Sequence, residues 1–178
     1  LRARQLDAAD PRRAEGALRY GGWLWVAGRL DEAARYYQEA LAARRAQQPP
    51  DLPELARALD ANGALHAAQG RYAEAIPLYE EALGLRRRAL GEVHRFTADS
   101  LSNLGAAQFD GGDPASAEAP LREALAIYAQ VLPPDSPVPA KTLNNLGLVR
   151  HARGDASEAR SLIERALVLN RHAYGSEH

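Results

Sequence analysis

Cysteine and methionine are both absent from the 178 residues of the chain. Without cysteine, the protein can form no disulfide, no thiolate zinc site and no cysteine nucleophile. An excess of one charge sign is also lacking, because 22 basic and 23 acidic residues give a formal net charge of -1. Electrostatic capture of nucleic acid or anionic lipid requires a basic excess. We therefore expect neither nucleic acid nor a membrane among the partners.

Long apolar runs are missing too, and none approaches the roughly 18 residues that a membrane span requires. The opening residues, LRARQLDAAD, carry charges with no apolar stretch behind them, which is unlike a secretory signal. These two features favour a cytoplasmic protein. The chain begins with Leu1 and is rich in alanine and arginine. We therefore expect it to be a piece of a longer protein from a bacterium.

Small residues recur along the chain with a period of 42 residues, and such repeats decide the architecture. Five columns of the repeat are filled four times each, with no insertion or deletion. The first glycine column is followed seven residues later by a second one, and two alanine columns and a leucine column follow. The members are Gly21, Gly63, Gly105, Gly147; Gly28, Gly70, Gly112, Gly154; Ala33, Ala75, Ala117, Ala159; Ala40, Ala82, Ala124, Ala166; and Leu41, Leu83, Leu125, Leu167.

Each repeat has the pattern of two helices separated by a turn. In the third repeat, apolar residues at helical spacing predict a first helix from about Thr97 to Phe109. The stretch DGGDP then ends it, because glycine supplies a left-handed C-cap, while Asp113 can cap the next helix. Proline suits the first position of a helix, so the second helix is predicted from about Pro114 to Val131.

A single helical hairpin cannot bury its apolar face alone, and stacking several hairpins gives one continuous core. The glycine and alanine columns allow the helix axes to approach closely, and leucine fills the space between hairpins. We therefore predict an all-α fold with four helix-turn-helix repeats in a single array. The repeats occupy about residues 11–50, 53–92, 95–134 and 137–176, and residues 1–10 form the tail of a preceding repeat.

The repeat resembles the tetratricopeptide signature, which is normally 34 residues long. The resemblance rests on Gly63, on the run Gly70–Arg71–Tyr72, and on Ala75, Tyr79 and Ala82. The junctions LGEVHR, LPPDSP, LDAADP and YGSEH resemble the L-G-x-x-H-P junction of the 42-residue variety found in kinesin light chains and in bacterial signalling proteins. This resemblance implies a right-handed α-α superhelix, or solenoid, whose first helices line an inner groove that binds proteins.

The stretch LNNLG places Asn144 and Asn145 inside an apolar helix, although Asn favours caps and turns. At 100° per residue, both amides lie opposite Leu143 and Leu146, which face the partner helix. We therefore expect the amide side to face the groove. The candidate binding residues on this side in the four repeats are Arg19, Trp25, Arg57, Asp60, Ser102, Asn103, Phe109, Lys141, Asn144, Asn145 and His151.

Asparagine both donates and accepts hydrogen bonds, so it can pair with the backbone of an extended peptide. In repeats of the kinesin light chain type, Asn at the positions of Asn103 and Asn145 clamps a peptide backbone, and the resemblance implies this role for those two residues. The alternative is that the polar side chains are simply solvated. Trp25 and Phe109 are either groove anchors or part of the core between repeats.

The sequence shows no pattern typical of catalysis or metal binding. The histidines His66, His94, His151, His172 and His178 form no H-x-x-x-H pair. No G-x-S-x-G motif, P-loop lysine or dinucleotide fingerprint is present. We therefore predict a protein that is not an enzyme and that uses no metal and no cofactor.

Three hypotheses of function follow from the sequence. The leading one is a protein–protein interaction module that binds, in its concave groove, a peptide or protein segment of a partner or of its own parent chain. The alternative is a structural spacer or self-associating array, with no groove ligand, inside a larger signalling or enzyme protein. The third is that the array is the recruiting or sensing arm of an enzyme.

Overall fold

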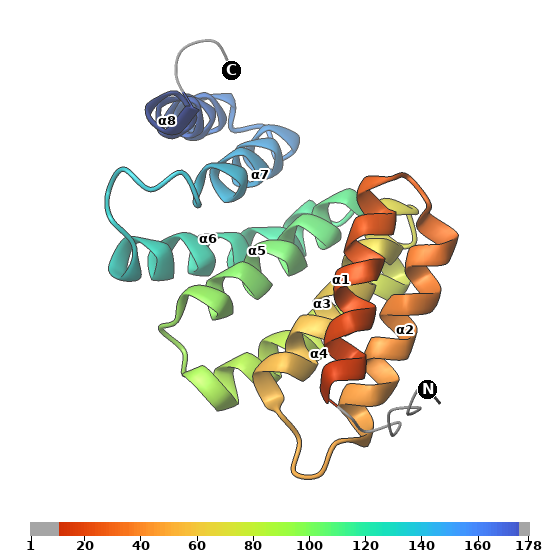
Figure 1. Ribbon diagram of the computed structural model, residues 1–178. Helices are drawn as coiled ribbons and strands as arrows, with labels where there is room; N and C mark the ends of the chain where they lie inside the picture. The colour runs from red at the N-terminus through yellow and green to blue at the C-terminus, as the bar shows by residue number, and fades with distance from the viewer. Residues whose placement is uncertain (1–10, 175–178) are drawn as a thin grey trace, which may run out of the picture. The chain divides into compact units, whose positions relative to one another are not determined.

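The computed structural model describes residues 11–174, and every regular element in this range is an α-helix (Figure 1). The all-α prediction is therefore confirmed. The predicted tail of a preceding repeat, at residues 1–10, lies outside the described residues, as do the last four residues of the junction YGSEH. The helices are α1 (Pro11–Val26), α2 (Leu30–Ala46), α3 (Leu52–Ala68), α4 (Tyr72–Leu90), α5 (Arg95–Asp110), α6 (Pro114–Val131), α7 (Ala140–Ala152) and α8 (Ala156–Tyr174).

Each predicted repeat contains two consecutive helices that pack on each other, so the described chain consists of four hairpins. The hairpins group into two compact units. The first unit holds α1 to α4 and the second holds α5 to α8, with the boundary at the end of α4, between Ala89 and Leu90. In the first unit α2 packs against α3, and in the second α6 packs against α7.

The first glycine column marks the closest approach of the two helices within each hairpin. A Cβ atom added at Gly105 would lie 2.6 Å from Cγ of Leu121, and one added at Gly147 would lie 2.8 Å from Cγ1 of Ile163. The same clash occurs in the first hairpin, where a Cβ on Gly21 would lie 2.6 Å from the ring of Tyr37. Any side chain here would push the helices apart, which explains why the column is glycine in all four repeats.

The second glycine column ends the first helix of each hairpin. Gly28, Gly70, Gly112 and Gly154 all have positive φ angles, between 72° and 91°, and only glycine adopts this left-handed conformation without strain. In the third repeat, Asp113 then caps α6, because its Oδ1 accepts a hydrogen bond from the backbone N–H of Ser116 at 3.0 Å. Hydrogen bonding to the side chain and then to the backbone N–H of Ser116 lowers the pKa of Asp113. The predicted turn is thus confirmed.

The start of α5 differs from its predicted position by two residues. The helix begins at Arg95 because Nδ1 of His94 accepts a hydrogen bond from the backbone N–H of Phe96 at 3.1 Å. Histidine is not among the preferred N-cap residues, so the sequence pattern placed the start at Thr97. The hydroxyl of Thr97 instead donates to the carbonyl of Gly91 at 2.9 Å, which fixes the junction that precedes the helix.

Candidate functional site

The two asparagines that motivated the binding hypothesis lie on neighbouring first helices of the second unit. Asn103 is on α5 and Asn145 is on α7, and these two helices contact each other. Both side chains are partly exposed, and neither amide forms a hydrogen bond with any residue in the range 11–174. We call Asn103 and Asn145 together the amide surface. It offers two uncommitted donor–acceptor groups in a row.

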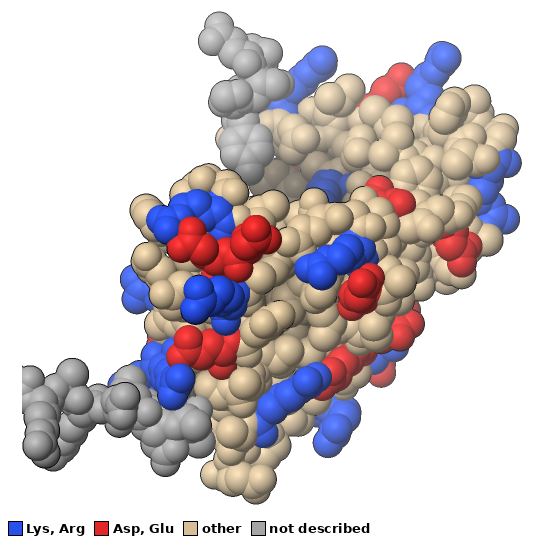
Figure 2. Space-filling model, turned by 90° about the vertical axis from the view of Figure 1, so that its right-hand side faces the viewer, with Lys and Arg blue, Asp and Glu red and all other residues tan. Residues whose placement is uncertain are grey.

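Three further predicted residues lie exposed on α7. They are Lys141, Asn144 and His151, and Lys141 forms no ion pair with any residue that the structure describes. Figure 2 shows one face of the molecule, on which basic and acidic side chains are intermingled with no broad area of one sign. That face therefore offers no extended basic surface to a polyanion.

Ser102 corrects the sequence-based prediction, because it does not face an open surface. Its side chain is buried, and its hydroxyl shares a 2.6 Å hydrogen bond with that of Thr142 on α7. Leu18, at the same repeat position in the first unit, is buried as well. In the first hairpin of each unit, this position therefore faces the second hairpin of the same unit. Asn144 is the exposed member because no hairpin follows α8 within the described residues.

Asp60 and Arg57 both form ion pairs within the first unit. A carboxylate oxygen of Asp60 lies 2.5 Å from the guanidinium of Arg86, and both side chains are largely buried. Arg57 is exposed and pairs with Glu54 at 2.5 Å. The Asp60 prediction is thus corrected, since this carboxylate joins α3 to α4. Arg19, which replaces asparagine in the first repeat, is exposed on α1.

The two aromatic candidates pack against the core. Trp25 lies against the core cluster of the first hairpin, with its ring centroid 6.5 Å from that of Tyr37. Phe109 lies against the apolar cluster that α6, α7 and α8 share in the second unit. Both rings are only partly exposed. Of the two interpretations left open by the sequence, core packing is the one that their positions favour.

Two buried polar contacts between helices were missed by the sequence analysis. Asn62, which directly precedes a column glycine, is buried and donates to the carbonyls of Tyr37 and Ala58 at 2.9 and 2.8 Å. The hydroxyl of buried Tyr128 donates to Oδ1 of Asp99 at 2.7 Å. Burial raises the pKa of Tyr128, and the nearby carboxylate of Asp99 raises it further. The available signal for Asn62 was an amide at a position where the other repeats carry Tyr20, Leu104 and Leu146.

His66 on α3 provides a test of the packing in the first unit. Its Nδ1 is buried without a hydrogen-bond partner. Burial and then the charge of Arg71 lower its pKa below the ordinary 6.5, against an opposing effect of Glu74. The native state therefore binds fewer protons than the unfolded state, and the free energy of unfolding should fall as the pH drops through about 6.5.

We expect nuclear magnetic resonance (NMR) titration of the His66 ring to give a pKa below that of an unfolded histidine peptide. Urea unfolding should show a His66→Gln variant losing less stability than the wild type between about pH 8 and about pH 5. An identical loss in both proteins would contradict the assigned environment of this ring.

Residues 11–174 contain neither a candidate metal site nor a candidate membrane-spanning helix. No group of three or more histidine, aspartate or glutamate side chains in this range could hold a metal ion. Within the same range, no helix is both long and apolar enough to cross a membrane.

Comparison with known protein families decides the assignment of the repeat. Two models, both described as tetratricopeptide repeat, match residues 54–130 and residues 140–178, which together make up more than half of the chain. The chain belongs to the tetratricopeptide repeat family. Members of this family are typically non-catalytic scaffolds, and the membership supports a protein–protein interaction module. Among curated proteins, none matches this tetratricopeptide chain.

Solved structures with the same fold include repeats of the kinesin light chain type. BtubC (BKLC) from P. vanneervenii is 26% identical with a TM-score of 0.83, over 99% of this chain and 70% of that one. The nearly identical TPR-like repeats of a provisionally assigned kinesin light chain from Podosopora anserina are 20% identical, with a TM-score of 0.74 over 97% and 82% of the two chains. The apo form of RapI is 16% identical with a TM-score of 0.82, and the match covers 96% of this chain and 59% of RapI.

Proposed function

We propose that this tetratricopeptide chain binds an extended peptide segment of a partner protein along the amide surface. The observation that carries the proposal is the pair Asn103 and Asn145, partly exposed on two contacting first helices and without hydrogen bonds to the described residues. By contrast, the predicted residues whose side chains make buried contacts within the protein have a packing role.

The geometry of the amide surface suits a β-type backbone. Axes of packed helices lie about 8–10 Å apart, and an extended chain advances about 3.3 Å per residue. Two amides on neighbouring helices would therefore meet backbone groups about three residues apart in the ligand. Because an amide both donates and accepts, each can pair with a peptide N–H and C=O whatever the ligand's side chains are.

The proposal is tested with peptides selected from a displayed random library on the immobilised 178-residue chain. A selected peptide should lose affinity by about tenfold or more for the double variant Asn103→Ala/Asn145→Ala, because each lost neutral hydrogen bond contributes about 0.5–1.5 kcal/mol. Isothermal titration calorimetry provides the affinities. Helicity and melting temperature should stay near those of the wild type, because neither amide forms a hydrogen bond with the described residues.

A matched control uses amides elsewhere on the second unit. Gln130 on α6 and Asn170 on α8 are exposed and carry the same group, so the variant Gln130→Ala/Asn170→Ala should bind the selected peptide like the wild type. Equal affinity of the Asn103→Ala/Asn145→Ala variant and the wild type would refute the amide surface as the binding site.

A further inference from the structure

The first described helix, α1, exposes positions that are buried in α3 and α7. On α7, packed against α6, Thr142, Leu146 and Val149 are nearly inaccessible, and on α3, packed against α2, the same is true of their equivalents Ala58, Asn62 and Leu65. The equivalent positions on α1 are Gly16, Tyr20 and Trp23. There Tyr20 is 45% exposed and Trp23 is 57% exposed. We call these three residues of α1 the leading face.

The leading face is built around ordered aromatic rings. Tyr20 stacks on Trp23 with ring centroids 5.7 Å apart, and its other side meets the edge of Tyr36 at 4.7 Å. Exposed clusters of large apolar side chains mark interaction sites on soluble proteins, and tyrosine and tryptophan dominate the energy of interfaces. On α3 and α7, the corresponding side of the helix is the one that meets the preceding hairpin of the same unit.

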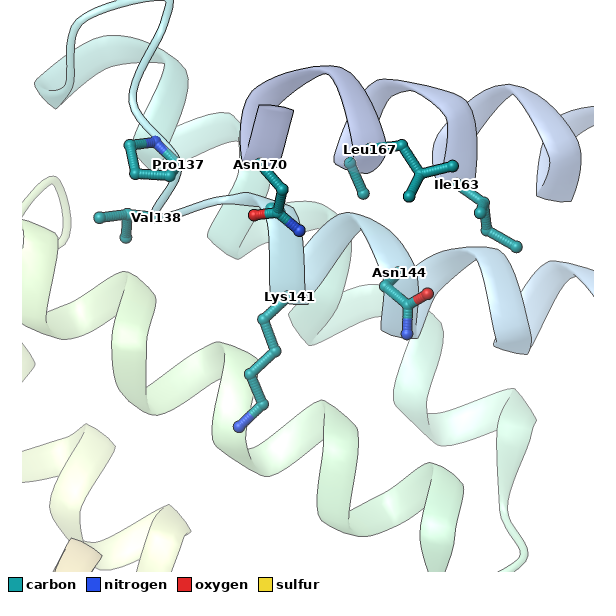
Figure 3. Close-up of a pocket in the computed structure, with 9 residues that line it drawn as sticks. Pro137, Val138, Lys141, Asn144, Ile163, Leu167 and Asn170 are labelled. Atoms are coloured by element: carbon teal, nitrogen blue, oxygen red, sulfur yellow. The ribbon is translucent and has the colours of Figure 1, made fainter. Parts of the chain in front are cut away.

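In the last described hairpin, a cavity of about 420 Å³ lies between α7 and α8. Figure 3 shows Lys141 and Asn144 extending from α7, and Leu167 and Asn170 extending from α8. We call these four residues the trailing face. Leu167 is 46% exposed.

In the third repeat the corresponding positions are covered by the next hairpin. Ser102 is bonded to Thr142 of α7, Leu125 packs against the cluster that includes α7, and Tyr128 is buried. In the first unit Arg44, the equivalent of Asn170, is also buried, and it pairs with Glu54 of α3 at 2.9 Å. The trailing face is thus the equivalent surface of the last described hairpin, and no described residue covers it.

We propose that the leading face of one copy of this chain docks on the trailing face of a second copy. The chain already makes this kind of contact twice, where α3 packs on α2 and where α7 packs on α6. A contact between two different faces leaves one leading face and one trailing face unused in a dimer, so further copies can add head to tail. Neither face contains a residue of the amide surface, so this proposal does not depend on the proposed function.

Repeat equivalence also predicts the charges that would meet across the new contact. The pair Arg45–Glu81, at 2.7 Å between α2 and α4, maps to Arg171 of one copy and Glu39 of the next. The pair Arg122–Glu158, at 2.9 Å, maps instead to two acids, Glu164 and Glu32. One mapped pair is attractive and the other repulsive, and Glu39 and Glu32 already pair with Arg13 and Arg29. Burial of the aromatic leading face would therefore provide the affinity.

The proposal is tested by sedimentation velocity on the full 178-residue chain, up to a concentration of about 1 mM to capture a weak contact. The wild type should form dimers and larger species as its concentration rises. Trp23→Asp removes the leading face and Leu167→Asp removes the trailing face, so each variant alone should stay monomeric. An equimolar mixture of the two should form a dimer and nothing larger, because each variant supplies the face that the other lacks.

The mixture separates head-to-tail docking from other forms of association. If two copies met through the same face, one variant would associate like the wild type and mixing would restore nothing. Val93→Asp, which places a charge at an exposed position between α4 and α5, is the control and should associate like the wild type. Monomeric wild type at every concentration, or mixed variants that stay monomeric, would overturn the proposal. Circular dichroism should show native helicity in all variants, because both substituted side chains are exposed.

Discussion

Gly105→Ala should destabilise the protein, although alanine is the better helix former. The added Cβ would lie 2.6 Å from Cγ of Leu121 and 3.0 Å from the backbone oxygen of Ala117. Leu121 is fully buried, and a backbone oxygen cannot turn away. Overpacking of this kind costs about 1–3 kcal/mol, while the gain in helix propensity is at most about 1 kcal/mol. We expect a net loss of about 1–2 kcal/mol in the free energy of unfolding.

The control for this prediction is Gly84→Ala, in the middle of α4. Nothing lies within 4 Å of a Cβ added there, and Gly84 is exposed. The substitution should therefore stabilise the protein by about 0.5–1 kcal/mol, the helix propensity difference alone. Urea unfolding of both variants gives the comparison. If Gly105→Ala were as stable as the wild type, the close approach of α5 and α6 would be wrong.

Thr142→Val should cost about 1–3 kcal/mol, because valine keeps the shape but removes a buried hydroxyl. Thr142 and Ser102 share a 2.6 Å hydrogen bond between α7 and α5, and both side chains are buried. Removal of Thr142 Oγ1 would leave the buried hydroxyl of Ser102 without this partner, which is the costly situation for a polar group in a core.

A double-mutant cycle separates this contact from general effects of the substitution. Ser102→Ala, Thr142→Val and the double variant are compared by urea unfolding. The double variant should be more stable than the sum of the single losses predicts, with a coupling of about 0.5–3 kcal/mol, because the second substitution removes the group that the first left unpaired. Strictly additive losses would show that the two hydroxyls do not interact.

Most of the fold could be predicted from the sequence because the same two-helix pattern recurs in every 42-residue repeat. The two glycine columns have distinct physical roles, close helix contact at Gly105 and a left-handed helix end at Gly112, and both follow from the absence of a side chain. The predicted limits of α6, about Pro114 to Val131, agree with the structure, and Asp113 and Pro114 marked its start. The start of α5 was missed because its cap is a histidine, a residue with no strong capping preference.

The candidate site was predicted less well, because helical periodicity gives the side of a helix but not what covers it. Asn103 and Asn145 are partly exposed, whereas Ser102, only one residue before Asn103, is buried against α7. A difference of 100° around the helix separates a solvent-facing position from one that faces the next hairpin. That boundary depends on how neighbouring repeats pack, and a single-helix pattern does not contain this information.

The most direct test of the proposed binding is the NMR spectrum of the asparagine side chains. The Nδ2 amide groups of Asn103 and Asn145 are observed in the ¹⁵N-labelled chain as a selected peptide is added, with Asn62 and Asn170 as internal references. Peptide binding at the amide surface should give large shifts for Asn103 and Asn145, little change for Asn170, and none for the buried Asn62. A peptide that saturates the protein while the signals of Asn103 and Asn145 stay in place would contradict it.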